Sequence, residues 1–509
     1  MVRVLQVGRM DLSREYPLPE GSEWVFCPPQ EVLPRFGEEG RQEHFEAVLI
    51  ETLPSEEACE CLCTLASPYT FFYTEGALPE GERMPDCLKQ RMIRRIRRET
   101  LQSFCGNLTR YFHDHHLGTK LAPGDIQVSS SFTGRMAFDG NRRMVMKGEF
   151  GKGFVPLLSW RTNIYCEAGM AQDLWLEYDH EPGVELQLVV RSFGQGGGIE
   201  PGNTYRFFEK EMAKPVRVSA GRESACFSLS LHVRGAGRIS IGALHYRFSR
   251  YGAGHFIPGG SVAYGKGRQE IFSYFDPGDA KPPLNVYFSG YRTAEGFEGL
   301  GMMQSLGAPF LLLSDPRLMG GCFYEGDESL KAAVEQELQS ALDTLGFTGR
   351  ECILSGLSMG TYGAVYYGAK IKPYAVIIGK PLLNLGTVAA GETLLRPGGF
   401  PTSLDVLRTL TGGLSERHVA ALNARLWEMV DKADFSETEF AVAYMESDDY
   451  DPTAYQDLLT HLQPLKARIV GKGTPGRHND NTAQVVEWFL SQYKRVLREG
   501  FGRVQVVRR

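Results

Sequence analysis

The chain has 509 residues, of which 42% are hydrophobic and 23% are charged, and its formal net charge is -6. This length exceeds the size at which a single hydrophobic core stops growing, so we expect two or three domains. The composition leaves little room for extended disorder, and the negative net charge argues against a general nucleic-acid binder. Ten cysteines in so long a chain do not indicate a disulfide framework.

The sequence carries no segment typical of membrane insertion or secretion. No run of 18 or more apolar residues is present, so no transmembrane helix is expected. The first eight residues have the pattern of a β-strand and lack the long apolar region and cleavage site of a signal peptide. We therefore expect a protein of the reducing cytoplasm, with peripheral contact at the inner face of the membrane as an alternative.

Residues 1–122 are predicted to form a small Rossmann-like α/β domain. Strands and helices that alternate in this way are typical of a parallel sheet. Gly8 leads into a segment without the Gly-rich dinucleotide motif, so we expect no tightly bound nucleotide cofactor here. The predicted strands are 2–7, 23–27, 47–50 and 70–73, and 86–112 is predicted as one helix.

Residues 123–282 are predicted to form a middle antiparallel β-sandwich followed by a linker. Regular short strands separated by Gly-rich turns are typical of such a domain. The stretch up to 282 is rich in Gly and Pro, and we expect it to be a linker or an edge poor in strands. The predicted strands are 144–147, 174–178, 184–190, 226–233 and 240–248.

Residues 283–509 are predicted to form an α/β-hydrolase-like catalytic domain, which makes the overall fold class α/β. The alternation of strands and helices returns more strongly here and favours a doubly wound parallel sheet. The predicted strands are 284–288, 310–313, 352–355, 374–378, 440–444 and 468–470, and the clearest helices are 328–345 and 481–497.

The segment 356–360, GLSMG in one-letter code, matches the G-x-S-x-G nucleophile elbow. A strand turns sharply into a helix at such an elbow, and the flanking glycines permit the strained turn that exposes the serine hydroxyl. An apolar strand at 352–355 precedes the motif, and a helix with small residues at 362–369 follows it. We therefore predict Ser358 as a catalytic nucleophile, with a structural tight turn as the alternative.

A serine hydroxyl needs a base to remove its proton, and in this fold the histidine comes last in the chain. His461 and His478 are the candidates. His461 lies inside a predicted helix, whereas His478 lies in the loop between the last strand and the last helix. Because an unperturbed histidine titrates near neutral pH, we predict His478 as the base.

The triad acid is expected in the acidic loop after strand 440–444, where it would orient the imidazole. We choose Asp448, with Asp449 and then Asp451 as alternatives.

The oxyanion hole should use the backbone N–H of Met359 and a second N–H that follows an earlier strand. Gly290 and Tyr291 follow the strand 284–288 and are equal candidates for that second donor. Arg292 is a candidate for contact with the substrate or for an ion pair with a carboxylate.

Three other clusters favour structural interpretations over functional ones. The segment 113–116, HDHH, lacks a matching set of metal ligands and is interpreted as a solvated helix end. Cys59, Cys61 and Cys63 lack the spacing of common zinc sites, so we expect core cysteines and no metal. The basic amphipathic stretch 91–98 is interpreted as a solvated helix face, with an acidic partner or anionic lipid as the alternative.

Five further segments are distinctive: GLGMMQSLGAPFLLL at 299–313, SDPR at 314–317, LSGLSMGT at 354–361, GKPLLNLG at 379–386 and RPGGFPTS at 396–403. With these segments the chain resembles the second of the accessory secretory (Asp) proteins, a family of the accessory Sec system of Gram-positive bacteria. Length and layout agree along the whole chain, and the specific motifs lie between residues 285 and 480.

The resemblance implies an O-acetyltransferase that modifies N-acetylglucosamine on serine-rich repeat glycoprotein adhesins and assists their export. It also implies a complex with two other accessory secretory proteins and delivery to a dedicated SecA-type motor. Ser358 and His478 match the family's nucleophile and base; its acid can be Glu, and the matching position here is Asp448, with the alignment open by a residue. An acetyl donor of unknown identity is required. A carbohydrate esterase and a non-catalytic export scaffold or chaperone remain alternatives.

Overall fold

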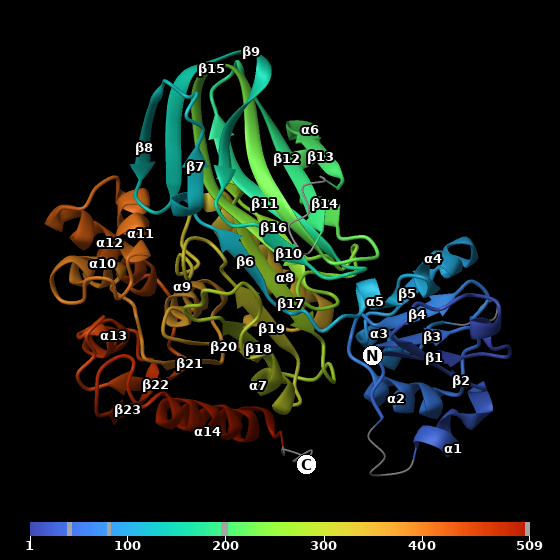
Figure 1. Cartoon of the computed structure of the whole chain (residues 1–509). Helices are drawn as coiled ribbons and strands as arrows, with labels where there is room; N and C mark the ends of the chain where they lie inside the picture. Colours follow the sequence, from blue (N-terminus) through green and yellow to red (C-terminus); the bar gives the residue numbers. More distant parts are fainter. Residues whose placement is uncertain (38–42, 79–82, 195–201, 504–509) are drawn as a thin grey trace. The chain divides into compact units, whose positions relative to one another are not determined.

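The computed structural model describes residues 1–37, 43–78, 83–194 and 202–503 (Figure 1). The chain divides into two compact units. The first comprises Met1–His116 with Phe248–Ser261 and Asp276–Ala280, and the second comprises the remaining described residues. No helix of the described residues is both long enough and apolar enough to cross a membrane.

The first unit is built on a five-stranded parallel sheet, as predicted, with the strand order β2-β1-β3-β4-β5. Apolar side chains fill both of its faces, because parallel strands connected by helices are covered on either side. The elements are β1 (Val2–Val7), β2 (Ser22–Cys27), α1 (Val32–Phe36), β3 (Ala47–Ile50), α2 (Glu56–Leu65), β4 (Phe71–Thr74), α3 (Asp86–Gln90), β5 (Arg94–Ile96), α4 (Leu101–Cys105) and α5 (Leu108–Tyr111).

The single helix predicted over 86–112 is wrong. The chain leaves α3 at Met92, which has a positive φ of 56°, and then forms the edge strand β5 beside β4. The Arg94 guanidinium lies over the Phe72 ring, 5.2 Å from its centroid, and donates to the carbonyl of Tyr69. Hydrogen bonding to the sheet therefore outweighs the helical propensity of the basic stretch 91–98. The interpretation of this stretch as a solvated helix face is wrong.

The cysteines of α2 belong to the core, as predicted. Cys59 and Cys63 are buried among the apolar side chains between α2 and the sheet, and Cys61 is partly buried. Burial raises the pKa of the Cys59 and Cys63 thiols to about 12. These thiols are therefore protonated at neutral pH and act as small apolar groups.

The histidine segment 113–116 is held by contacts to residues 249–256 of the same unit. The ring of His113 lies 3.3 Å from the carbonyl of Ser249. The buried Arg250 guanidinium donates to the carbonyls of Tyr111 and His113 at 2.8 Å each. Burial lowers the pKa of His113 to about 3, so the expected solvated helix end is only partly solvated.

The middle of the chain forms an antiparallel β-structure in the second unit, as expected. Its ten strands share one hydrogen-bonded network, organised around the long strand β15. The elements are β6 (Gly118–Leu121), β7 (Ile126–Val128), β8 (Arg135–Asp139), β9 (Arg143–Trp160), β10 (Ile164–Cys166), β11 (Ala171–His180), β12 (Val184–Gly194), β13 (Thr204–Phe208), α6 (Glu209–Met212), β14 (Val216–Ser219) and β15 (Ala225–Phe248).

The strands predicted at 226–233 and 240–248 are in fact one strand, β15. It pairs with β12 at its start, with β9 along its middle and with β6 at its end. Gly235 lies at the irregular part of the strand with a φ of 96°, where a Cβ would come within 1.9 Å of the carbonyl of Gly183. The glycine that this bend requires was read in the sequence as a turn, and the single strand was therefore predicted as two.

The rest of the second unit is an eight-stranded sheet in the order β16-β17-β19-β18-β20-β21-β22-β23, and the strands from β19 to β23 are parallel. The predicted doubly wound sheet is confirmed. Its strands are β16 (Ser261–Tyr264), β17 (Glu270–Asp276), β18 (Leu284–Phe288), β19 (Phe310–Ser314), β20 (Cys352–Leu357), β21 (Ala375–Gly379), β22 (Glu439–Met445) and β23 (Arg468–Thr474). Its helices are α7 (Leu300–Ser305), α8 (Glu328–Leu345), α9 (Gly360–Ile371), α10 (Leu385–Leu394), α11 (Thr402–Thr411), α12 (Glu416–Val430), α13 (Ala454–Leu462) and α14 (Thr482–Phe501).

The Gly- and Pro-rich stretch before 282, which was expected to be poor in strands, contributes β16 and β17 to this sheet. The run 270–276, EIFSYFD, is almost fully buried. Its aromatic and β-branched residues suit a sheet, and their signal was obscured by the glycines and prolines on either side.

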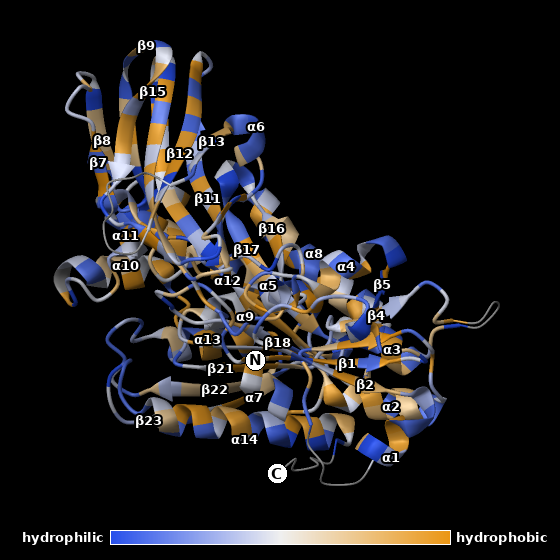
Figure 2. Ribbon diagram, turned by 45° about the vertical axis from the view of Figure 1, so that its right-hand side comes forward, coloured by the Kyte–Doolittle hydropathy of each residue, from blue (hydrophilic) through white to orange (hydrophobic). Residues whose placement is uncertain are grey.

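Helices cover both faces of the sheet because successive side chains of a strand point to opposite faces. Leu354 belongs to the apolar cluster that includes α8 and α9, whereas the neighbouring Ser355 accepts a 2.5 Å hydrogen bond from Tyr493 of α14. Figure 2 shows α14 with hydrophobic and hydrophilic residues alternating along its length, as expected for a helix with one buried face.

The strand order reverses at β18. From β18 the chain moves to β19 on one side and then crosses to β20 on the other side. Ligands of open α/β sheets bind beyond the carboxyl ends of the strands at such a switch point. Here the carboxyl ends are Phe288, which precedes the predicted oxyanion loop, and Leu357, which precedes Ser358 in the elbow.

Candidate active site

Ser358 lies in a strained turn between β20 and α9. Its φ is +53°, a left-handed conformation that is unusual for a residue other than glycine. A Cβ on Gly356 would come within 2.5 Å of the backbone of Gly360, and a Cβ on Gly360 would come within 2.0 Å of the carbonyl of Phe288. Both glycines of the motif are therefore required by the close approach of β18, β20 and the start of α9.

Ser358 contacts the imidazole of His478. The distance from Ser358 Oγ to His478 Nε2 is 2.8 Å, within hydrogen-bond reach of a nucleophile and its base. His478 lies in the loop between β23 and α14, as predicted, and only 4% of its surface is exposed. The sharp turn of the elbow and this long loop bring together two residues that are 120 positions apart.

Asp448 completes the chain of contacts. Its Oδ2 lies 2.8 Å from His478 Nδ1, and its Oδ1 accepts the amide hydrogens of Tyr450 and Asp451. Burial opposes ionisation of this carboxyl group, but the hydrogen bond and charge of His478 and the two amides outweigh it and lower its pKa. Asp448 is therefore an anion at neutral pH and fixes the orientation of the imidazole.

The alternative residues lie elsewhere. Asp449 accepts the backbone N–H of His478 at 3.1 Å, so it holds the loop rather than the ring. Asp451 is buried and accepts the amides of Leu383 and Asn384 at 2.7 Å each. His461 lies in α13, where its ring contacts Asp431 at 2.6 Å and is not part of the Ser358 site.

The ring of His478 is covered by Tyr450, with 4.7 Å between the ring centroids. The guanidinium of Arg396 in turn lies 3.5 Å over the Tyr450 ring and donates through Nε to the carbonyl of Asp449. This stack shields one side of the imidazole and holds the loop that carries Asp448.

Lys380 fixes the part of the loop that follows His478. Its ammonium group donates to the carbonyl of Asp480 and to the hydroxyl of Thr482 at 2.8 Å each. Burial lowers the pKa of Lys380, and Asp448 acts in the opposite direction. Lys380 therefore ties the end of β21 to the first turn of α14, next to His478.

The loop after β18 lies directly against the elbow, because a Cβ on Gly290 would be 3.0 Å from the carbonyl of Leu357. The Gly290 amide donates to the Glu298 carboxylate at 2.6 Å. Within the described residues, the amides of Tyr291 and Met359 have no hydrogen-bond acceptor. Among the described residues, the amides of Met359, next to Ser358 in the chain, and of Tyr291, next to Gly290, are therefore unpaired, while that of Gly290 is occupied.

Arg292 forms no ion pair with any residue that the structure describes. It is partly buried and lies two positions after Gly290. It therefore stays a candidate for contact with a substrate.

The far end of the same loop is anchored by a buried network of charges. Glu295 contacts His245 and Arg247 at 2.6 Å each, and it lies 3.6 Å from Lys120. Arg247 also contacts Glu270 at 2.6 Å. Burial opposes the charge of His245, but Glu295 and Glu177 outweigh it and raise its pKa to about 9. The loop is thereby fixed to the β-structure of the second unit.

Sequence reasoning missed Glu298, Lys380 and this network. Their side chains come from elements that are far apart in the chain, and single charged residues carry no spacing pattern. The one available signal was position, since Lys380 lies two residues beyond the strand predicted at 374–378 and Glu298 lies ten residues beyond the strand predicted at 284–288.

Comparison with known proteins identifies one family along the whole chain. A family model described as the accessory Sec system GspB transporter matches residues 2–503. The second accessory Sec protein of Streptococcus gordonii is 38% identical over 505 residues, which cover 99% of each chain. Its counterpart from Staphylococcus aureus is 37% identical over 513 residues, which cover 99% of this chain and 98% of the relative.

A solved structure shares the fold over the same length. One chain in the glycosylation-associated protein (Gap123) complex of Streptococcus agalactiae is 35% identical, with a TM-score of 0.91 and 99% of both chains covered. The arrangement of sheets and helices described above is therefore common to this chain and that relative.

Proposed function

The chain belongs to the family of the second accessory secretory protein of the accessory Sec system, and from this premise we propose that it is an O-acetyltransferase. Its proposed acceptor is N-acetylglucosamine on a serine-rich repeat glycoprotein adhesin, whose export it also assists. Ser358 is the proposed nucleophile, His478 the base and Asp448 the acid that orients it.

The observation that carries the proposal is the continuous series of contacts from Ser358 Oγ through His478 to Asp448, with both distances at 2.8 Å. The strained φ of Ser358 and its place at the switch point of the sheet add to it. A partly exposed serine with a buried histidine and a buried carboxylate behind it are the groups that acyl transfer requires.

In the first step His478 Nε2 takes the proton of Ser358 Oγ, and the oxygen attacks the carbonyl carbon of the acetyl donor. The resulting oxyanion is stabilised by the Met359 amide and by that of Tyr291, or by that of Gly290 once Glu298 releases it. Collapse of the intermediate breaks the bond to the leaving group, which receives the proton from His478. An acetyl-serine ester remains.

In the second step a sugar hydroxyl attacks that ester. His478 takes the hydroxyl proton as the new carbon–oxygen bond forms, and Ser358 Oγ leaves with the same proton. Asp448 stabilises the imidazolium in both steps and stays ionised, in keeping with its lowered pKa. If water replaces the sugar, the same residues perform ester hydrolysis, which is the esterase alternative.

The proposed partners follow from the relatives. The Streptococcus agalactiae relative was solved in a complex named Gap123. We propose that this chain likewise assembles with two other accessory secretory proteins and acts before a dedicated SecA-type motor.

The test is Ser358→Ala in the native host, with mass spectrometry of the glycans on the exported adhesin. Loss of acetyl mass with continued export is the expected result, and it would separate the chemistry from export. Unchanged acetylation would contradict the enzymatic proposal and favour a scaffold. Purified protein given an activated acetyl ester with or without N-acetylglucosamine distinguishes transfer from hydrolysis, because only transfer produces the acetylated sugar.

A further inference from the structure

A cavity of about 450 Å³ lies in the second unit, apart from the residues of the Ser358 site. Its walls come from the start of β9, from β11, from the segment 317–328 and from helices α8, α11 and α12. None of Ser358, His478 and Asp448 lines it. This volume lies in the range of sites that hold a small molecule.

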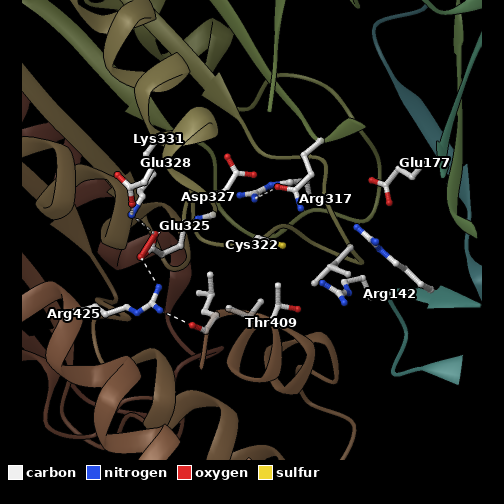
Figure 3. A pocket seen from close by; sticks show the side chains of 16 residues that line it. Arg142, Glu177, Arg317, Cys322, Glu325, Asp327, Glu328, Lys331, Thr409 and Arg425 are labelled. Carbon is white, nitrogen blue, oxygen red and sulfur yellow. Dashed lines mark hydrogen bonds and ion pairs between the residues drawn. The ribbon is translucent and has the colours of Figure 1, made fainter. Parts of the chain in front are cut away.

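Charged side chains surround the cavity, and Figure 3 shows Arg142 and Glu177 on the side opposite Lys331 and Arg425. Both of these cations contact Glu325, at 3.8 Å from Lys331 Nζ and 3.5 Å from Arg425. Lys331 also contacts Glu328 at 2.6 Å. The charges at this end are therefore mutually compensated.

The other acidic groups of the wall also have partners. Asp327 accepts the amides of Ser329 and Leu330 and so caps the start of α8. Glu177 lies 3.3 Å from the ring of His245, which is protonated at neutral pH. Each acidic side chain in the cavity wall therefore already has a hydrogen-bond or ion-pair partner within the chain, so the cavity does not require a bound cation.

The cations at the β9 end differ in whether they form a direct ion pair within the described residues. Arg317 is matched by the Asp315 carboxylate, with two contacts at 2.8 and 2.7 Å, and Arg142 is matched by Asp139 at 2.5 Å. Arg143 has no hydrogen bond or ion pair with any side chain in the described part of the chain. Burial and the charge of Arg142 lower the pKa of Arg143, and the charges of Glu177, Asp179 and Asp139 oppose that shift without a direct contact.

The N–H groups of a half-buried guanidinium that has no direct hydrogen-bond partner among the described side chains are available to an acceptor from outside the chain. Arginine presents a planar set of donors that matches phosphate oxygens in pairs. Gln269 lies at the same cavity and uses its carbonyl oxygen to accept from Arg317 at 3.2 Å, which leaves its amide nitrogen as a donor. Thr409 adds a hydroxyl group.

We propose that this cavity binds a small phosphorylated molecule, with Arg143 contacting the phosphate. Gln269 and Thr409 contact the polar remainder of the ligand. The site is separate from the Ser358 chemistry, so it extends the molecule's activities beyond the proposed acetyl transfer and does not depend on it.

The test is calorimetric titration of the full chain with inorganic phosphate, glucose 1-phosphate, glucose and acetate. We expect both phosphate probes to bind, and glucose and acetate to bind at least tenfold more weakly. Arg143→Met should weaken glucose 1-phosphate binding at least tenfold, and Arg143→Lys should weaken it less. The exposed Arg222 gives the matched control, since Arg222→Met should leave affinity unchanged.

Thermal unfolding of each variant checks that the fold is retained, and the milder Arg143→Lys serves if Arg143→Met does not fold. Ser358→Ala should bind the phosphate probes as the unmodified chain does, which separates this site from the proposed catalysis. Failure of both phosphate probes to bind at millimolar concentration would overturn the proposal. So would equal affinity of the unmodified chain and the folded Arg143 variant, or equal affinity for acetate and phosphate.

Discussion

The backbone N–H of Gly290 donates a 2.6 Å hydrogen bond to the carboxylate of Glu298. Gly290 was one of two equal candidates for the second oxyanion donor, and it lies beside the carbonyl of Leu357 at the elbow. A carboxylate therefore holds an amide that would otherwise be available to a developing oxyanion. The amide of Tyr291, which has no acceptor among the described residues, is the donor that this arrangement favours.

Glu298→Gln should raise the turnover of an activated acetyl ester. The carboxylate at the Gly290 amide repels negative charge that develops on the substrate, and a neutral amide of the same shape removes that repulsion. We expect kcat to rise roughly threefold to tenfold, which is on the order of 1 kcal/mol. Glu437→Gln, at a carboxylate that is 77% exposed, is the control and should have no effect. A lower kcat for Glu298→Gln would show that the carboxylate positions the loop.

Replacing each acid of the 448–451 loop by its amide should separate their roles. Asp448→Asn should lower kcat by roughly 10³ to 10⁴, because the imidazole loses its ionised partner. Asp449→Asn should cost less than about tenfold, since its oxygen accepts only a backbone N–H of His478. Asp451→Asn should mainly lower the melting temperature, since this buried group holds the amides of Leu383 and Asn384. A loss with Asp449→Asn as large as that with Asp448→Asn would contradict the assignment.

Gly321→Ala should impair catalysis more than stability. Gly321 has a φ of 106°, and an added Cβ would come within 2.6 Å of the Met359 side chain, whose amide is a proposed oxyanion donor. Gly346→Ala is a matched control, because Gly346 has a φ of 70° but nothing lies within 4 Å of the added Cβ. Both variants should lose about 1 kcal/mol of stability, and only Gly321→Ala should lose at least about tenfold in kcat. Equal kcat values for the two variants would refute a role for this contact.

The buried His245 should make stability depend on pH. Its pKa rises from an ordinary 6.5 to about 9 on folding, so the folded state binds the proton more tightly than the unfolded state. The stabilisation is fully present below pH 6.5, reaches roughly 3 kcal/mol at most, and is lost as the pH rises through 9.

Urea unfolding of His245→Gln and of the unmodified chain at pH 6 and pH 9.5 tests this dependence. The difference in unfolding free energy between the two proteins should be large at pH 6 and much smaller at pH 9.5. His44→Gln, at an exposed histidine, is the control and should show no such change. A difference that stays constant across this range would mean that His245 is not charged in the folded protein.

The sequence predicted the elements whose local pattern and tertiary environment agree. The strand ending in the elbow and the helix 328–345 were found because their apolar periodicity matches the face that they bury. The stretch 86–112 has a helical pattern but became an edge strand between short helices, because hydrogen bonding to β4 stabilises the strand. The pairing of two strands that are distant in the sequence cannot be predicted from the pattern of residues within either strand.

By itself the sequence determined the α/β class and predicted Ser358 and His478 as nucleophile and base, because G-x-S-x-G and the order of strands and loops are local signals. Only the tertiary structure decided which of the three aspartates reaches His478. The backbone conformation of the loop directs the Asp448 carboxylate to the imidazole ring and the neighbouring Asp449 carboxylate to the backbone N–H of His478. The tertiary structure also decided that Glu298 holds the Gly290 amide and that Arg143 forms no ion pair with any described side chain. Contacts between residues distant in the chain depend on how the strands are ordered in space, and composition and periodicity do not record that order.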